Sequence, residues 1–255
     1  MFLFAQTNLQ LRQQMRDQQY SEADISRMNA AYEIAVPMFS GRFRGSGKPF
    51  IAHLVGTASI LASRKVEVEM LLAGLLHAAY TVGDLGFHPG RRQSQKQRAY
   101  IRQCVGRDVE NLISLYDANP WSAEKIASDA RDWKTMDLGQ RNSVLMRLAN
   151  TYEDFMDGAM AHGVSDKNSM YVSAVLQEDI LKLTELTDWP ELGELQATAF
   201  KEFNEALNTV NRTDDSKFSR LRLPPSAARK VIPAMEGWLA RRLRKWFMPT
   251  DRRQL

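Results

Sequence analysis

Hydrophobic residues recur along most of this chain with the period of an α-helix, and no segment shows the two-residue alternation of a half-buried strand. Ile25, Met28, Ala31 and Ala35 mark one face of a predicted helix that begins after Ser21, a suitable N-cap residue. Further helices are predicted over residues 50–65, 66–82, 95–105, 107–118, 122–135, 139–162, 167–187, 190–210 and 226–247. The first 14 residues are predicted to form the first turns of a helix, because they lack the basic region and long apolar core of a signal peptide.

The helical pattern predicts an all-α protein with one main domain over residues 1–210. A polar linker follows at 211–225, and a basic tail helix at 226–255. No apolar run reaches the roughly 20 residues that span a bilayer. The single cysteine, Cys104, excludes an internal disulfide and a thiolate-rich zinc site, and it indicates a reducing cytoplasm. Any metal site must therefore use histidine, carboxylate or amide groups.

The charge of the chain is concentrated in its tail. The whole chain carries a formal charge of +4, but eight basic and two acidic residues give +6 to residues 229–255 alone. The remainder, at −2, is close to neutral for its size. The tail also carries an apolar stripe at helical spacing, which includes Leu239, Leu243 and Trp246.

A basic helix with aromatic residues on its apolar side suits the surface of an anionic membrane. Packing on a protein partner or on the body of this chain explains the same stripe, and nucleic acid is disfavoured because no nucleic-acid motif accompanies the charge. The residues predicted to dock are Trp238, Leu239, Arg241, Arg242, Leu243, Arg244, Lys245, Trp246 and Phe247. The predicted location is the cytoplasm, with attachment to the inner face of the membrane as an extension of that prediction.

Three segments carry the candidate chemistry: "RFRGSGKPFIAHLVGTASIL" at 42–61, "LLAGLLHAAY" at 71–80 and "VLMRLANTYEDFMD" at 144–157. In order and spacing they resemble the HD superfamily of helical phosphohydrolases, and most of all the hydrolase domain of the RelA/SpoT-type alarmone enzymes of bacteria. The resemblance covers roughly residues 25–160 and implies an HD-domain-like helical bundle. It also implies a metal ion held by two histidines and two aspartates, which activates a water for attack on phosphorus.

Carried onto this chain, the two family histidines match His53 and His77. The aspartate after the second histidine falls on Ala78, which has no donor atom, and the last aspartate falls on Asn150, a neutral amide. The acidic pair that handles the attacking water in the family falls on Thr81 and Val82. Because hard divalent ions prefer charged oxygen donors, no metal is expected here.

A substitute carboxylate is the alternative. Asp84 follows the second segment, and Glu153 and Asp154 lie one helical turn past Asn150. Either Asp84 or Asp154, with His53 and His77, would give a rearranged site for Mn, Fe or Zn.

The loop of the first segment is a candidate anion site. Arg42, Arg44, Ser46 and Lys48 supply charge and donors, and glycines beside them expose backbone N–H groups near a helix N-terminus. The resemblance implies that the matching basic residues contact a guanine nucleotide. A flexible surface turn explains the loop equally well.

Three hypotheses for function follow. The first is a catalytically degenerate HD-like domain, a regulatory or accessory module with a residual pocket at His53, His77, Asn150 and Asp154 for a nucleotide or other phosphorylated small molecule. The second is an active metal-dependent phosphohydrolase with the rearranged site. The third is a structural protein that docks through its basic tail. The sequence leaves the ligand and the oligomeric state open.

Overall fold

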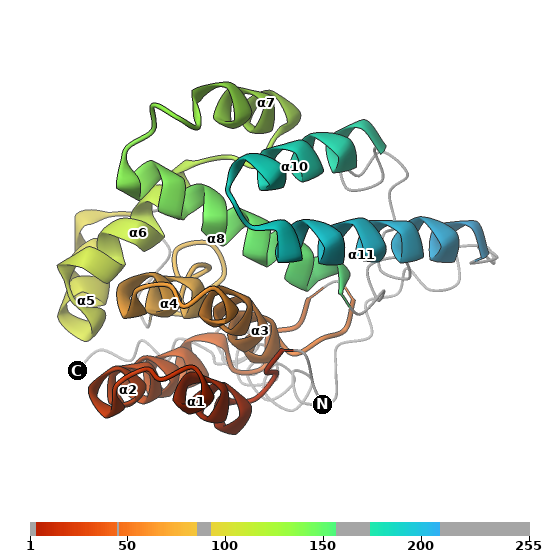
Figure 1. Cartoon of the computed structure of the whole chain (residues 1–255). Coiled ribbons are helices and arrows are strands. Elements are labelled where there is room, and N and C mark those ends of the chain that lie inside the picture. Colours follow the sequence, from red (N-terminus) through yellow and green to blue (C-terminus); the bar gives the residue numbers. More distant parts are fainter. Residues whose placement is uncertain (1–3, 45, 86–92, 157–173, 210–255) are drawn as a thin grey trace, which may run out of the picture. The chain divides into compact units, whose positions relative to one another are not determined.

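The computed structural model describes residues 4–44, 46–85, 93–156 and 174–209, all within one compact unit of the chain, Met1–Asn211 (Figure 1). The other unit, Arg212–Leu255, lies outside the described residues. The predictions for the linker at 211–225 and for the basic tail helix, with its docking residues from Trp238 to Phe247, therefore also lie outside them.

Every named element of the described residues is an α-helix, so the predicted all-α fold class is confirmed. An isolated β-bridge joins Phe43 to Pro49 in the loop before α3. The helices are α1 (Asn8–Asp17), α2 (Glu22–Phe39), α3 (Phe50–Ser63), α4 (Val68–Leu75), α5 (Gln95–Val105), α6 (Arg107–Ala118), α7 (Ala123–Asp132), α8 (Leu138–Phe155), α10 (Ala174–Leu186) and α11 (Pro190–Thr209).

Polar residues fix where many of these helices begin. The Ser21 side chain accepts a hydrogen bond from the backbone N–H of Asp24 at the start of α2, as the sequence predicts. Thr7, Ser94 and Asp137 begin α1, α5 and α8 with reciprocal capping boxes. Each such cap typically contributes about 1 kcal/mol, so the helix starts are largely set by local sequence.

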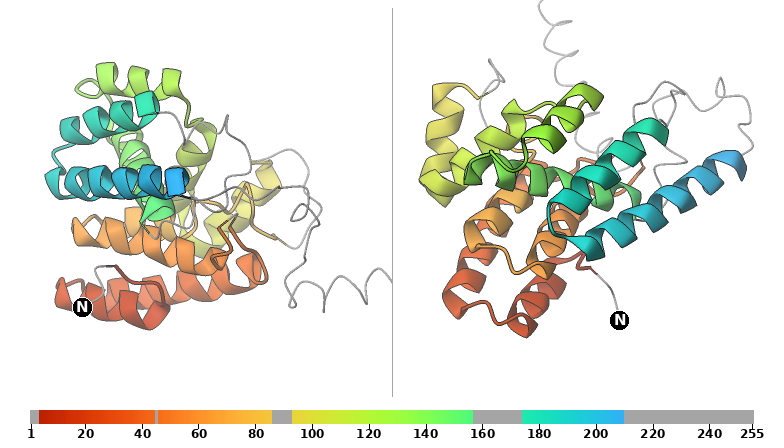
Figure 2. Two further views of the ribbon diagram at one scale, coloured as in Figure 1. Left: turned by 90° about the vertical axis from the view of Figure 1, so that its right-hand side faces the viewer. Right: turned by 45° about the horizontal axis from the view of Figure 1, so that its top comes forward.

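The helix α3 lies at the centre of the bundle. The α1–α2 pair packs against α3 and α4 on one side, and α8 packs against α3 on the other (Figures 1 and 2). In the α10–α11 hairpin, α11 packs on α8 and α10 packs on α7, while α6 packs on α4 and α8, and α5 packs on α6. Buried residues run without a break from His53 to Ala62, which is why α3 is apolar on almost every face. The elements α3, α4 and α8 meet here, and they carry the three segments identified in the sequence.

Two predicted boundaries are wrong. The helix predicted over 66–82 ends at Leu75, and residues 76–82 form turns in which Ala79 N–H bonds to Leu76 C=O and Thr81 N–H to Ala78 C=O. At the N-terminus, α1 begins only at Asn8. Phe4 and Ala5 are buried ahead of it, and the Ala5 N–H donates to Ser59 Oγ at 2.7 Å. In both places tertiary contacts override a pattern that is compatible with a longer helix.

Among the helices of the described part, none is long and apolar enough to cross a membrane.

Candidate functional site

The first segment places His53 in the middle of the bundle. α3 starts immediately after Pro49, and His53 lies one turn inside it with its side chain fully buried. Phe50 stacks on Phe39 and meets the His53 ring edge-on at 5.4 Å. Aromatic packing therefore holds the imidazole on the side of Phe50, and polar partners contact it from other sides.

The second segment presents His77 from a turn rather than from a helix. Its Nδ1 donates to the carbonyl of Gly74 at 2.7 Å, which leaves Nε2 as the acceptor atom of the ring. The ring lies edge-on to His53, at 5.3 Å between centroids, and to Tyr116, at 5.0 Å. The two histidines of the resemblance are thus adjacent, and Ala78 beside them brings only a methyl group.

The third segment brings Asn150, Glu153 and Asp154 to the same place from α8. The spacing of three and four residues puts all three on one face of the helix, and all three are buried. Asn150 Nδ2 donates to Asp154 Oδ2 at 3.4 Å, and His53 Nδ1 lies 3.6 Å from Asp154 Oδ1. The His53 Nδ1 also contacts Glu153 Oε2 directly. Glu153, which the sequence offered only as a substitute carboxylate, is therefore a principal partner of His53.

The basic loop folds back on this cluster. Arg44 forms an ion pair with Asp154, and Lys48 forms one with Glu153. The other two loop residues of the prediction do not join them, since Arg42 is exposed and Ser46 is half-buried. The N–H of Gly47 donates to the carbonyl of Arg44 at 2.9 Å, so this backbone donor already serves the turn.

Burial controls the protonation of the cluster. Burial lowers the pKa of His53 to about 3, against the opposing effect of Asp154. Burial and the neighbouring His53 lower the pKa of His77 well below its usual value. Burial raises the pKa of Asp154, while His53 and Arg44 act to lower it. Near neutral pH both imidazoles are therefore uncharged.

Two buried acceptor atoms of the cluster lack partners. Because the carboxylate of Glu153 accepts, the Nδ1 of a neutral His53 carries the proton and Nε2 holds a lone pair. This Nε2 and Oδ1 of Asn150 are buried without a hydrogen-bond partner within the described part of the chain. Leaving such an atom unsatisfied costs about 1–3 kcal/mol.

The donor set does not fit the metal site that the resemblance implies. Ligand atoms of His53, Glu153 and Asp154 do lie within 4.8 Å of one another. However, His53 Nδ1 and Glu153 Oε2 are in direct contact with no space for an ion between them, and both carboxylates already face a cation. Asp84, the other candidate carboxylate, is exposed, and its backbone N–H is bound to the carbonyl of Met38.

A cavity of about 560 Å³ opens beside the cluster. Its lining joins the three sequence segments to residues of α6 and of the loop that follows it, a part that the sequence analysis did not identify. The lining residues are Arg44, Phe50, His77, Ala78, Thr81, Val82, Tyr116, Asp117, Ala118, Asn119, Pro120, Arg147, Asn150 and Asp154. Arg147 precedes Asn150 by three residues on α8, and this spacing was the one signal in the sequence that could have indicated it.

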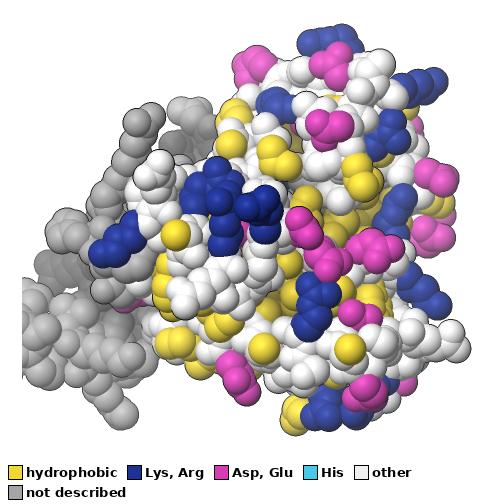
Figure 3. Space-filling view, turned by 90° about the vertical axis from the view of Figure 1, so that its left-hand side faces the viewer, with side chains coloured by type: hydrophobic (Ala, Val, Ile, Leu, Met, Phe, Trp, Pro, Cys, Tyr) yellow, Lys and Arg dark blue, Asp and Glu magenta, His cyan; other side chains and the backbone are white. Residues whose placement is uncertain are grey.

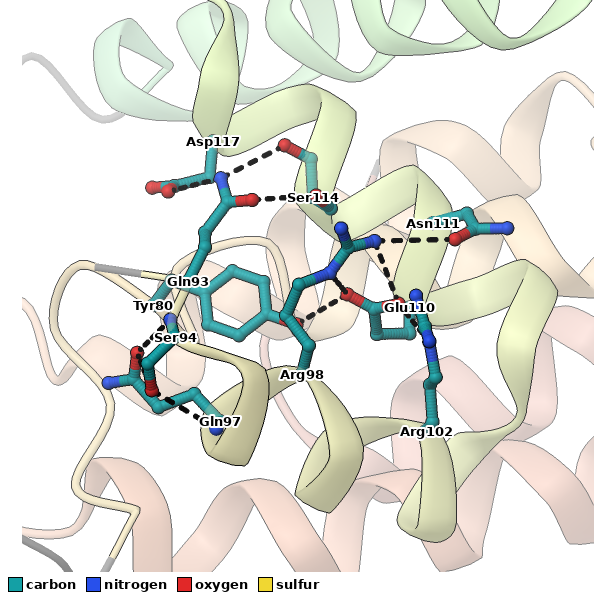
Figure 4. Close-up of polar contacts among 10 residues, drawn as sticks. All are labelled: Tyr80, Gln93, Ser94, Gln97, Arg98, Arg102, Glu110, Asn111, Ser114 and Asp117. Carbon is teal, nitrogen blue, oxygen red and sulfur yellow. Dashed lines mark hydrogen bonds and ion pairs between the residues drawn. The ribbon is translucent and has the colours of Figure 1, made fainter. Parts of the chain in front are cut away.

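A buried polar network joins the turn after His77 to α5 and α6 (Figure 4). Tyr80, from the turn after His77, donates to the fully buried Glu110 at 2.8 Å, and Glu110 also accepts from Arg98 and Arg102 at 2.6 Å. Burial acts to raise the pKa of Glu110, but the hydrogen bonds from Arg98, Tyr80 and Arg102 together hold it below its usual value. Both arginine side chains are partly exposed, and the face on the side of α5 and α6 shows basic and acidic side chains at several places (Figure 3).

Comparison with known proteins finds related sequences over part of the chain. A family model described as a domain of unknown function (DUF6817) matches residues 38–120. The bifunctional (p)ppGpp synthase/hydrolase SpoT of Escherichia coli is 39% identical over 77 residues, which is 30% of this chain and 10% of that protein.

Two further relatives give the same result. The bifunctional (p)ppGpp synthase/hydrolase RelA of Mycobacterium tuberculosis is 40% identical over 68 residues, which is 27% of this chain and 9% of that protein. The guanosine-3′,5′-bis(diphosphate) 3′-pyrophosphohydrolase of Vibrio cholerae is 39% identical over 57 residues, 22% of this chain and 8% of its own length. The chain thus spans about a tenth of the length of the curated relatives it matches, and the similarity relates one segment of it to enzymes with these names.

Proposed function

We propose that this helical domain is a catalytically degenerate HD-like module, which binds a phosphorylated, nucleotide-like small molecule without metal-dependent hydrolysis. The observation that carries the proposal is the pairing of Asp154 with Arg44 and of Glu153 with Lys48, next to His53. Such a module would act as a regulatory or accessory part of a larger process.

The ion pairs matter because they neutralise the carboxylates that a metal ion would need as ligands. A hard divalent ion takes carboxylate oxygens as ligands and is repelled by neighbouring cations. Here the guanidinium of Arg44 and the ammonium of Lys48 already neutralise both carboxylates, and Ala78 and Asn150 supply no replacement charge. Protein cations take the place of the ion, and they cannot activate a water as a metal does.

The ligand class is supported by the cavity and by the relatives. A volume of about 560 Å³ is within the range of about 300–1,000 Å³ for small-molecule sites. The names of the similar proteins refer to (p)ppGpp and to guanosine-3′,5′-bis(diphosphate), so guanosine 3′,5′-bis(diphosphate) is the first probe to use.

The test combines three measurements on the full-length chain purified without chelator. We expect substoichiometric metal by elemental analysis, no release of pyrophosphate from guanosine 3′,5′-bis(diphosphate) with or without Mn²⁺, and saturable binding of the same compound by calorimetry. Absence of binding overturns the proposed pocket. Stoichiometric Mn, Fe or Zn that disappears in His77→Ala overturns the proposal that the domain is catalytically degenerate.

The second candidate is an active metal-dependent phosphohydrolase with a rearranged site at His53, His77 and Asp154. It is favoured by the unpartnered Nε2 of His53 and Oδ1 of Asn150, two donor atoms that a metal could use. The same measurements separate it from the first, because it requires both the metal and Mn²⁺-dependent turnover.

A further inference from the structure

One cation in the lining of the cavity forms no ion pair with any residue that the structure describes. Arg147 projects from α8, one turn before Asn150, and lines the cavity on the side of α6. Within the described ranges its side chain takes part in no ion pair, whereas Arg44, the other arginine of the lining, is paired with Asp154. The second carboxylate of the lining, Asp117, accepts a hydrogen bond from Gln93 at 2.7 Å.

The guanidinium of Arg147 is nevertheless held in one position. Its Nη2 donates to the carbonyls of Tyr116 at 2.6 Å and Asn119 at 2.7 Å, and its Cζ lies 3.7 Å from the centroid of the Tyr116 ring. These contacts fix the group without neutralising it, because carbonyls and an aromatic face carry no net charge. A charge fixed in this way binds an anion with little loss of side-chain entropy.

Donor groups of Arg147 remain available. Its Nε–H is buried without a hydrogen-bond partner among the described residues, and the hydrogen bonds of the guanidinium run from Nη2 alone. An arginine offers five N–H donors, and with Nη2 of Arg147 turned to the two carbonyls the N–H groups of Nη1 make no hydrogen bond among the described residues. These groups can donate to an anionic oxygen in the cavity, and such charge-assisted hydrogen bonds are stronger than neutral ones.

We infer that Arg147, rather than Arg44, binds the anionic group of the ligand. This inference rests on the proposed function, in which that group is a phosphate. The charged end of the ligand then lies against the wall formed by α6 and the loop after it. The remainder of the ligand lies toward His77 and Asn150, where it meets the neutral surface of Ala78 and Val82. Arg147 is thus a specificity-determining residue that selects phosphorylated over unphosphorylated compounds.

The chain supplies a matched control on the same helix. Arg141 also lies over an aromatic ring, that of Trp133 at 5.6 Å, and donates to a backbone carbonyl, that of Lys134 at 2.9 Å. It does not line the cavity. Replacing Arg141 therefore removes the same kinds of contact and the same charge from α8 without touching the site.

The experiment measures the dissociation constants of guanosine 3′,5′-bis(diphosphate) and of guanosine by calorimetry at fixed ionic strength. We expect Arg147→Gln to weaken binding of guanosine 3′,5′-bis(diphosphate) about tenfold or more and Arg141→Gln to leave that binding unchanged. Neither substitution should alter the dissociation constant of guanosine. Arg147→Lys keeps the charge and serves if Arg147→Gln fails to fold. A loss of about threefold or more is expected from it, because a single ammonium cannot donate to the two carbonyls and to the anion in the geometry of the guanidinium.

The outcomes are distinguishable. If the wild type binds the bisdiphosphate and both Arg147 variants, folded by circular dichroism, bind it equally well, the inference is wrong while the proposed function stands. If the wild type binds neither compound, the proposed function fails and the inference fails with it. An equal loss in Arg141→Gln would also overturn the inference, because the effect would then be one of overall charge.

Discussion

Lys48 and Glu153 are 105 residues apart in sequence, yet the ammonium of one is paired with the carboxylate of the other beside the buried His53. The pair connects the loop before α3 to the C-terminal half of α8. It also places a cation beside a carboxylate that is buried inside the bundle.

Replacing Lys48 with Met should therefore destabilise the protein strongly. Removing one partner of a buried ion pair leaves the other charge uncompensated, and the usual cost is about 3–5 kcal/mol. Urea unfolding followed by circular dichroism measures the change. The control is Lys182→Met, since Lys182 is mostly exposed and its loss should cost less than about 0.5 kcal/mol. Equal effects of the two substitutions would show that the internal pair has no special role.

Gly56 on α3 should resist even the smallest side chain. A Cβ at Gly56 would lie 2.5 Å from Glu153 Oε1 and 2.8 Å from Glu153 Cγ, and this carboxylate is held in place by Lys48 and His53. Alanine favours helices over glycine by about 1 kcal/mol, but overpacking in a filled core costs about 1–3 kcal/mol. We expect Gly56→Ala to lower the free energy of unfolding.

The control for this prediction is Gly193→Ala on α11. A Cβ there would meet only Thr184 Cγ2, at an ordinary contact distance of 3.8 Å. The same substitution should raise stability by up to about 1 kcal/mol, so the two variants should change thermal stability in opposite directions. A stabilised Gly56→Ala would contradict the close approach of α3 and α8.

The negative charge of Glu110 should contribute to stability through its hydrogen bonds. Glu110→Gln removes the acceptor of charged hydrogen bonds from Arg98 and Arg102, and each such bond is worth about 1.5–3 kcal/mol. Because both arginines are partly exposed and can turn to water, we expect a net loss of about 2 kcal/mol. Tyr80→Phe should cost less, and the two effects should not add, since both residues share one interaction. Additive losses in the double variant would contradict the network.

The pH dependence of stability should reflect His77. Its pKa is lowered in the folded protein, so between that value and about 6.5 the unfolded chain binds a proton that the folded chain does not. Stability is then complete above about pH 6.5 and falls as the pH decreases below it, by up to about 1.4 kcal/mol per pH unit. Urea unfolding at pH 7 and pH 5 should show a smaller loss in His77→Gln than in the wild type. An equal loss would mean that His77 titrates normally.

Adding two acidic residues to the site should create a metal response. Ala78→Asp together with Asn150→Asp adds two anionic oxygen donors beside two neutral imidazoles, which suits Mn²⁺ better than the present set. We expect Mn²⁺ to raise the melting temperature of this double variant and to leave the wild type unchanged. Asn150→Asp alone is the control and should respond weakly. A wild type that responds as strongly as the double variant would show that the existing residues already hold the ion.

Local sequence determined the helices and one part of the site. Hydrophobic periodicity and polar caps are set within a few residues, so α5 and α6 occur where the pattern predicts them, and Ser21 begins α2. The resemblance selected His53, His77 and Asn150, and the fold brings them together because α3, α4 and α8 pack on one another.

Only the tertiary structure decided where α4 ends and which charges of the site are neutralised. The apolar run through residues 66–82 gave no sign that the helix ends at Leu75, because the turn is stabilised by contacts such as that of Tyr80 with Glu110, 30 residues away. Nothing in the spacing of Lys48 and Glu153 indicates that they pair, since an ion pair across 105 residues depends on how the loop before α3 meets α8. The sequence by itself selected His53, His77 and Asn150 as candidates for binding a metal or a ligand. Their packing decided which charges were already neutralised and left Arg147 without an opposite charge among the described residues.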